Sequence, residues 1–441
     1  MSAPSTPIPP IPPIRPITPC AIRAWTVTSA AGPGRQALSD ALAGDATALQ
    51  RLDATRWPAW ALETWVGAVD ALDQPPDPAA PPFPGDRAER SSRALQLAWL
   101  GLQGDGFIDA TREAVARWGA DRVGLLLGSS ASTIGVSEQA WRDWPPGAPV
   151  PEVLRHPSLN TPHAVTGFVQ RALGLAGPAL TVSTACSSSA KVFASAERWL
   201  RLGWVDAVVV GGVDALCASV LYGFRALGLV STSPCRPFDV ARDGISIGEA
   251  AGYALLERWE PGDDPATPCL IGHGESNDAH HMSSPHPQGL GAERALDEAL
   301  ARAGLSAASI DLVLLHGTAS ERNDAVEAAL VARRYRADVH ASASKGLTGH
   351  TMGAAGIVQA VAGLQALAGA GWPGSIGTEV VDPALPAPFA QQLRRAAVRG
   401  EPGEPAQPGA PGARVRRVAS HAFGFGGNNC VLLFGRAGGG S

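Results

Sequence analysis

Cys186 lies in the stretch TVSTACSSSAKVFASAERWL, where a β-branched run precedes the cysteine, and three serines and an amphipathic helical pattern follow it. This order predicts a thiol at a turn from a strand into a helix. The N-terminus of a helix offers free N–H groups and a partial positive charge, which favour thiolate and lower the pKa of a cysteine. Cys186 is therefore a candidate nucleophile; the alternative is a buried structural cysteine in a serine-rich turn.

Two histidines occur at junctions of the same kind. His316 ends the apolar run IDLVLLH, and His350 lies in the glycine-rich stretch KGLTGHTMGAAG. Active sites of α/β proteins open where buried strands end. One such histidine alone is more often structural, but two of them together with Cys186 predict a Cys/His/His site. The loop in SHAFGFGGNNCVLLFG adds backbone N–H groups that can face an oxyanion.

Lysine is rare in this chain. Of 35 basic side chains, only Lys191 and Lys345 are lysine. The compact ammonium of lysine and the planar fork of arginine are not interchangeable. We therefore expect Lys345, five residues before His350, to mark a site that requires an ammonium; the alternative is chance.

The elements that must position these residues are short apolar runs that alternate with longer helical patterns. The runs are GPALTVSTA before a helix from Cys186, VDAVVVGG, GYALLER, IDLVLLH before a helix from Asp324, and VHASAS before the helix that follows His350. Their alternation predicts an α/β fold with buried central strands. The predicted organisation is a disordered Pro-rich arm (1–20), a half that carries the cysteine (21–264), a half that carries the histidines (265–437) and a flexible tail (438–441).

The composition of the chain restricts the classes of function. With 45% apolar residues, 17% charged residues and a formal charge of -5, the chain is globular and has no basic field for nucleic acid. Its six cysteines are scattered, which argues against a zinc site and fits a reducing cytosol. The N-terminus lacks the pattern of a signal peptide, so a cytoplasmic location is expected. Residues 352–371 are the best candidate for a membrane span, but they are expected to form a buried helix.

Motifs over roughly residues 120 to 435 resemble those of the β-ketoacyl-acyl-carrier-protein synthases, the elongating condensing enzymes of fatty acid and polyketide synthesis. The similar motifs are TACSSS, RPFDVARDGISIGEAAG, DAHHMSSPHPQG, HGTASERND, KGLTGHTMGAAG and FGFGGNN. The resemblance implies a thiolase-like fold, with two related βαβαβαββ halves in a five-layered α-β-α-β-α arrangement, usually as a dimer. It does not extend to the Pro-rich arm.

The chemistry implied by this resemblance is a decarboxylative Claisen condensation. Cys186 would accept an acyl chain from a carrier-protein thioester, and His316 and His350 would hold the carbonyl of a malonyl thioester while carbon dioxide leaves. Two imidazole donors in a dry pocket stabilise the resulting negative oxygen more strongly than water does. No metal or bound organic cofactor is therefore expected, since the substrates arrive on the phosphopantetheine of acyl carrier protein.

The other roles implied by the resemblance fall on residues near these three. They are an oxyanion hole from the backbone N–H groups of Cys186 and Phe425, a gate to the acyl channel at Phe425, binding of the pantetheine arm by Thr318 and Ser320, and a structural pair of Glu327 with Lys345.

The chain departs from the family in ways that bear on pathway. Ser320 and Asn428 stand where the family usually has threonine, and GEAAG replaces GEGAG. The pattern favours a specialised synthase, such as those of aryl-polyene or other polyketide-like clusters. A degradative thiolase would need a second reactive cysteine, and Cys430 is expected to be core. A chain-length-setting partner subunit typically lacks the nucleophile, which this chain keeps at Cys186.

An acyl carrier protein is the expected partner, together with a second copy or a related synthase subunit in a dimer. In PGDRAERSSRALQLAWLGL, Arg87, Arg90 and Arg93 have the spacing i, i+3 and i+6. On one helix they would share a broad face, and an acidic carrier protein would be drawn to it. The alternative is an ordinary solvated surface.

Overall fold

The computed structural model describes residues 14–75, 81–395 and 414–437. Of the predicted arm, only residues 14–20 are among these, and the backbone N–H of Ile17 donates to the carbonyl of Arg302 at 2.9 Å. The predicted tail, 438–441, lies outside the described residues.

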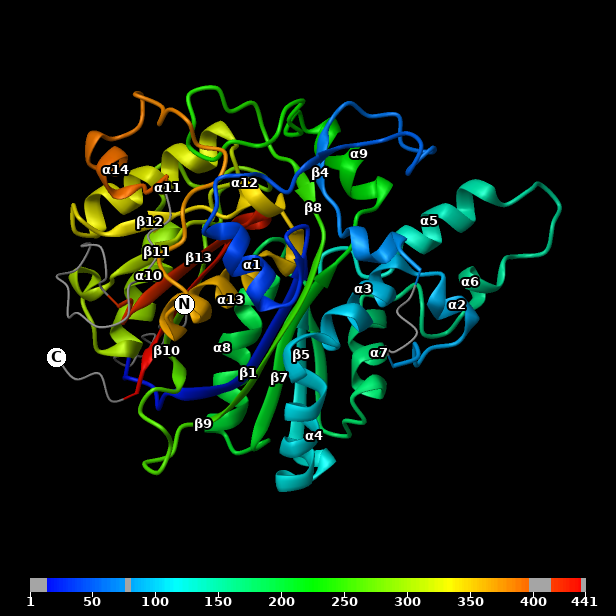
Figure 1. Ribbon diagram of the computed structural model, residues 1–441, viewed down its shortest axis with the longest axis horizontal. Helices are drawn as coiled ribbons and strands as arrows, with labels where there is room; N and C mark the ends of the chain where they lie inside the picture. Colours follow the sequence, from blue (N-terminus) through cyan, green and yellow to red (C-terminus); the bar gives the residue numbers. More distant parts are fainter. Residues whose placement is uncertain (1–13, 76–80, 396–413, 438–441) are drawn as a thin grey trace, which may run out of the picture.

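One large sheet runs through the molecule (Figure 1). Its first half comprises β1 (Cys20–Ser29), β5 (Val123–Gly128), β6 (Ala179–Val182), β7 (Ala207–Asp214) and β9 (Ala250–Arg258). Its second half comprises β10 (Pro268–Asn277), β11 (Leu312–Leu314), β12 (His340–Ser342), β13 (Val418–Gly424) and β14 (Asn428–Arg436).

The two halves of the sheet repeat one topology. The spatial order is β12-β11-β13-β14-β10 in one half and β6-β5-β7-β9-β1 in the other, and both read 3-2-4-5-1 in chain order. In each half, the second strand in the spatial order (β11 or β5) pairs in parallel with both of its neighbours. The fourth strand (β14 or β9) pairs antiparallel with both of its neighbours. The halves meet where β1 pairs with β10, Cys20 with Leu270 and Ala21 with Cys269. The predicted pair of related halves is confirmed.

Helices form three layers around the two halves of the sheet. The middle layer is α8 (Ser188–Arg201) and α13 (Ala355–Ala368), which share one core with the facing strands of both halves. The outer layers are α3 (Arg93–Leu102), α4 (Phe107–Trp118) and α7 (Ala164–Ala172) on the first half, and α10 (Leu290–Ala303) and α11 (Glu321–Arg334) on the second. This is the predicted five-layered arrangement.

Strand side chains alternate between the layers, as the two-residue period of a strand requires. In β5, Leu126 faces the middle layer, whereas Leu125 and Leu127 face the outer helices. Because both faces of each central strand are covered, the strands appear in the sequence as continuous apolar runs such as VDAVVVGG.

The two middle helices touch through small residues. A Cβ built on Gly356 of α13 would lie 2.4 Å from the backbone nitrogen of Ala190 in α8, closer than van der Waals contact allows. Glycine at 356 therefore permits the close approach of these helices.

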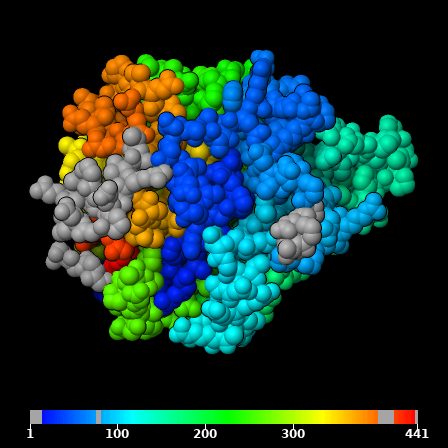
Figure 2. All heavy atoms as spheres, viewed as in Figure 1, coloured from blue at the N-terminus to red at the C-terminus, as the bar shows by residue number. Residues whose placement is uncertain are grey.

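The remaining elements surround this framework. They are β2 (Gly32–Pro33), which pairs with β1, a small sheet of β3 (Gln50–Arg51), β4 (Trp65–Gly67) and β8 (Ile247–Gly248), and helices α1 (Arg35–Leu42), α2 (Arg87–Arg90), α5 (Ile134–Asp143), α6 (Glu152–Arg155), α9 (Ala218–Ala226), α12 (Lys345–Thr348) and α14 (Ala387–Gln392). The segment with α5 and α6 projects from one side of the molecule (Figures 1 and 2).

The sequence candidate for a membrane span is an interior helix. Residues 355 to 367 of α13 are all buried in the middle layer. Within the described part of the chain, no helix has the length and apolar character needed to cross a membrane.

The three arginines proposed for carrier docking do not share a helix. Arg90 ends α2, and Arg93 begins α3 after a break at residues 91 and 92. Arg93 is also occupied, since its guanidinium contacts Glu249 at 2.6 Å and Asp73 at 3.0 Å. The Glu249 side chain is fully buried and needs a cation to offset the cost of burying its charge. The prediction of a common face is therefore wrong for Arg93.

Candidate active site

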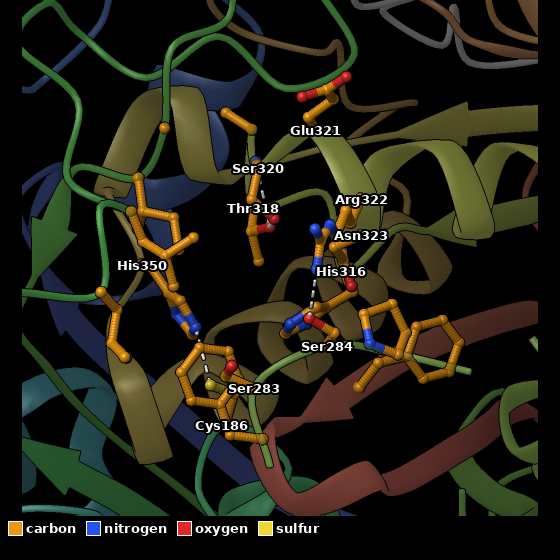
Figure 3. Close-up of a pocket in the computed structure, with 18 of the residues that line it drawn as sticks. Cys186, Ser283, Ser284, His316, Thr318, Ser320, Glu321, Arg322, Asn323 and His350 are labelled. Atoms are coloured by element: carbon orange, nitrogen blue, oxygen red, sulfur yellow. Dashed lines mark hydrogen bonds between the residues drawn. The ribbon is translucent and has the colours of Figure 1, made fainter. Parts of the chain in front are cut away.

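Cys186, His316 and His350 lie together in one cavity of about 420 Å³. Thr318, Ser320 and Phe425 also line it. Figure 3 shows His350 pointing at Cys186 and His316 facing the same space. Residues from both halves of the chain therefore line a single cavity.

Cys186 lies in a tight turn between β6 and α8. Ala185, immediately before it, has a φ of 52°, a conformation that costs energy for a residue with a Cβ. The serines that follow hold the turn: the Ser187 hydroxyl donates to the carbonyl of Thr184 at 2.9 Å, and the backbone N–H of Thr184 donates to the Ser188 hydroxyl at 2.9 Å. The serine-rich sequence therefore stabilises the conformation that presents the sulfur.

The Cys186 thiol is not acidified in the way that the sequence suggested. Burial raises its pKa to about 11 and outweighs the lowering by the charge of Lys345 and by the backbone N–H groups of Phe425 and Cys186. The expectation of a lowered pKa is wrong. The local sequence shows that Cys186 precedes a helix, but it does not show the burial of the thiol, which depends on the packing of the whole fold. The two N–H groups that act on the sulfur are the pair proposed for the oxyanion hole.

His350 presents an N–H group to the sulfur. Its Nε2 lies 2.9 Å from Cys186 Sγ, and its Nδ1 accepts from the backbone N–H of Met352 at 3.2 Å. Burial and the Lys345 charge hold the pKa of His350 well below its usual value, so the ring is neutral. With Nδ1 accepting, the one ring proton is on Nε2. His350 is thus a hydrogen-bond donor toward the cavity.

The His316 ring lies at a right angle to that of His350, with centroids 5.6 Å apart. Burial, Lys345 and His350 lower its pKa well below the usual value. Its backbone N–H donates to Glu327 at 2.7 Å, and that of Gly317 donates to the other carboxylate oxygen at 2.8 Å. The carboxylate therefore fixes the turn that carries the imidazole.

Lys345 and Glu327 approach His316 from different sides. The Lys345 ammonium donates to the backbone carbonyl of His316, and no direct ion pair joins it to Glu327 among the residues that the structure describes. The predicted pair is wrong in this respect, because the Glu327 oxygens are taken by backbone N–H groups and by His421. Burial lowers the pKa of Lys345 to about 8, against the opposing charge of Glu327. Lys345 is the first residue of α12.

A Lys345→Arg variant is expected to fold but to lose at least about tenfold in condensing activity. Lys345 is 2% exposed, and a longer planar guanidinium would displace the His316 turn. The matched control is Lys191→Arg, expected to be nearly silent, because Lys191 is half-buried on α8 and its ammonium bonds only Asn428, at 3.2 Å, among the described residues. Steady-state condensation rates compare the two, and full activity of Lys345→Arg would show that an ammonium is not required.

The remaining predicted site residues line the same cavity. Thr318 and Ser320 bond each other through their hydroxyls at 2.9 Å, which leaves acceptor lone pairs for a ligand. Phe425 stacks on Phe224, with ring centroids 5.4 Å apart. The role of Phe425 as a gate to the acyl channel stays a prediction.

One cluster among the described residues has the donor atoms for a metal ion. The Cys186 sulfur and a nitrogen of each imidazole all lie within 4.8 Å of one another. These are the atoms of the site itself, so a soft metal ion held there would compete with substrate.

Sequence reasoning missed the residues that support this site through tertiary contacts. Phe224 lies in a helical segment without a recognisable motif. Met352 contributes only its backbone N–H, so its residue type gives no signal in the sequence. Met352 has a φ of 52°, and no local pattern indicated this strain.

Comparison with known proteins agrees with this geometry. The family models "Beta-ketoacyl synthase, N-terminal domain" and "Beta-ketoacyl synthase, C-terminal domain" match residues 18–261 and 269–379. A mitochondrial 3-oxoacyl-[acyl-carrier-protein] synthase of Arabidopsis thaliana is 33% identical over 61% of this chain, a match that spans 59% of the relative. A 3-oxoacyl-[acyl-carrier-protein] synthase 2 of Synechocystis is 29% identical over 71% of this chain and 75% of its own length.

A solved structure extends the similarity over nearly the whole chain. It is a ketosynthase, ApeO, in complex with its chain length factor, ApeC, from Xenorhabdus doucetiae, with 32% identity, a TM-score of 0.78 and coverage of 95% of this chain and 98% of the other. The two family models together span more than half of the described sequence. This chain belongs to the β-ketoacyl synthase family.

Proposed function

We propose that this protein is a β-ketoacyl-[acyl-carrier-protein] synthase that elongates acyl chains by decarboxylative Claisen condensation. The observation that supports this most is the convergence of one cysteine sulfur and two neutral imidazoles in a single cavity.

In the first step, the Cys186 sulfur attacks the carbonyl of an acyl thioester on the carrier. The backbone N–H groups of Cys186 and Phe425 stabilise the tetrahedral oxyanion. The bond to the carrier sulfur breaks, and the proton lost from Cys186 ends on that departing thiol. His350 Nε2–H and the Lys345 charge stabilise the thiolate form of Cys186 until the new bond has formed.

In the second step, a malonyl thioester enters and its carbonyl oxygen accepts from the imidazoles of His316 and His350. Its carboxylate leaves as carbon dioxide, and the electron pair of the broken C–C bond forms an enolate. The enolate carbon attacks the acyl carbonyl on Cys186 and expels the cysteine sulfur, which takes up one proton. The product is a 3-oxoacyl-carrier, two carbons longer. These steps use only protein groups, the two substrates and one proton from water, which the expelled cysteine sulfur takes up.

The alternatives lack the required groups. A degradative thiolase would need a second reactive cysteine, but Cys430 is fully buried in β14 and burial raises its pKa well above the usual value. A chain-length-setting subunit that lacks catalysis would not need the strained turn at Ala185 that presents a thiol.

We further propose a division of labour between the halves. Residues 21–264 supply the nucleophile, and residues 265–437 supply both histidines. Because the cavity combines both, neither half alone would catalyse the condensation. In cells we place the enzyme in the cytoplasm with acyl carrier protein and, by analogy with the ApeO–ApeC complex, with a related subunit or a second copy.

Intact-mass measurement after incubation with a panel of acyl carrier proteins tests the function. One acyl group should load per chain, and addition of malonyl carrier should release it as a carrier-bound product two carbons longer. A protein that loads acyl groups but never elongates them would contradict the proposal. The chains that load would also assign chain length and starter group.

Docking of the carrier at α2 remains a prediction for Arg87 and Arg90, which are both exposed. An Arg87→Glu/Arg90→Glu double variant should raise the Michaelis constant for carrier severalfold and weaken its dependence on salt. Arg112→Glu on α4 is a suitable control, since its side chain is also exposed. Unchanged carrier kinetics in the double variant would place docking elsewhere.

A further inference from the structure

A second imidazole lies behind the site, where the proposed mechanism makes no use of it. His421 on β13 is fully buried and does not line the cavity. Its Nδ1 lies 3.1 Å from Glu327 Oε1, and its Nε2 lies 2.8 Å from the hydroxyl of Tyr335, at the C-terminal end of α11. Tyr335, His421 and Glu327 thus form a continuous chain of hydrogen bonds.

The direction of this chain follows from what each group can donate. An ionised carboxylate only accepts, so His421 Nδ1 carries the proton and donates to Glu327. With that proton on Nδ1, Nε2 is the acceptor for the Tyr335 hydroxyl. Burial raises the pKa of Tyr335, so this hydroxyl keeps its proton.

The chain ends at the turn of His316. Glu327 Oε1 accepts from both His421 and the backbone N–H of His316, while Oε2 accepts from Gly317. On the other side of the same turn, Lys345 donates to the His316 carbonyl. Glu327 and Lys345 therefore hold the peptide groups that flank the His316 side chain from two sides, and His421 orients the Glu327 carboxylate.

Aromatic contacts add to this connection. The Phe423 ring lies 5.2 Å from the His421 ring and 6.0 Å from the His316 ring, centroid to centroid. By contrast, the Cys186 sulfur hydrogen-bonds with the His350 ring, and that ring accepts from the backbone N–H of Met352; neither bond involves Glu327, His421 or Tyr335.

We propose that His421 and Tyr335 are positioning residues for His316, acting through Glu327, and that they serve the malonyl half-reaction and not acyl loading. This inference rests on the proposed function, because it assumes that His316 holds the malonyl carbonyl. The placement explains why a histidine with a tyrosine partner occupies a buried position next to the glycine-rich loop.

The test separates the two half-reactions in His421→Ala, His421→Asn and Tyr335→Phe. His421→Ala should lower the rate of condensation about tenfold or more, because misplacement of a catalytic group by about 1 Å costs on that order, while the rate of acyl loading stays within about twofold. His421→Asn should recover most of the loss, because its amide nitrogen can occupy the place of Nδ1 and donate to Glu327. Tyr335→Phe should fall between them.

His273→Ala is the matched control. His273 is also a buried imidazole beside a buried carboxylate, with Nε2 3.3 Å from Glu197, but it does not line the cavity. Its removal should leave the ratio of condensation to loading unchanged, whatever it does to the melting temperature.

Specific results would overturn the inference. Equal losses in loading and condensation for His421→Ala, or no recovery in His421→Asn, would show a merely structural role. If His421→Ala does not fold, Tyr335→Phe decides: unchanged condensation in that variant overturns the inference. A wild-type protein that neither loads acyl groups nor releases carbon dioxide would instead contradict the proposed function.

Discussion

A Cys186→Ala variant is expected to load no acyl group and to lose condensation on the order of 10⁴-fold or more, as removal of a covalent nucleophile does. The structure gives the reason: the imidazole N–H of His350 and two backbone N–H groups act on this one sulfur. Intact mass and peptide mapping after incubation with acyl carrier measure the loading.

The other cysteines serve as controls for this prediction. Cys217 and Cys430 are buried like Cys186, but neither lines the cavity that holds the two histidines. Alanine at either position should leave loading intact. An acyl mass on Cys217 or Cys430, or loading of Cys186→Ala, would show that the nucleophile is misassigned.

The second large effect is expected from His316→Ala and His350→Ala. Each should lower decarboxylation of malonyl carrier about 10²- to 10⁴-fold, since each removes a donor to the developing oxyanion. Both variants should keep some acyl loading, and His316→Ala should keep more, because only His350 contacts the sulfur directly. Release of carbon dioxide from labelled malonyl carrier measures the effect.

The control for the histidine variants is again His273→Ala, which removes a buried imidazole outside the cavity. Carbon dioxide release at the wild-type rate in both His316→Ala and His350→Ala would exclude the assigned roles. Loss of loading in parallel with decarboxylation in His316→Ala would indicate that this ring supports the nucleophile instead.

The residues of the site were predictable because the motifs are local in sequence. Cys186 follows β6 and His316 follows β11, and both strands are visible in the sequence as short runs before a turn, whereas His350 follows the short helix α12. The alternation of strands and helices likewise predicted the α/β class, since buried strands leave continuous apolar runs.

The errors arose where long-range packing decides the outcome. The resemblance implied that Glu327 pairs with Lys345, but backbone N–H groups of the His316 turn bind both oxygens of the carboxylate. Helix position suggested an acidic Cys186, but burial dominates its pKa. Arg93 was expected at the surface, yet the buried Glu249 draws it inward.

The partnership of His421 with Tyr335 could not be predicted from the sequence for a similar reason. The two residues are 86 positions apart and meet only because β13 lies beside the helix that ends at Tyr335. No periodicity or motif in the sequence encodes such a contact.

The contact of α8 with α13 through Gly356 also has a consequence for how this enzyme can change. The cysteine precedes α8 and His350 precedes α13, so the separation of these two interior helices determines the separation of sulfur from imidazole. A methyl group added between the helices would lengthen that distance without altering any group that reacts. We therefore expect turnover to depend on the volume of the small residues between these helices, although they do not touch the substrate.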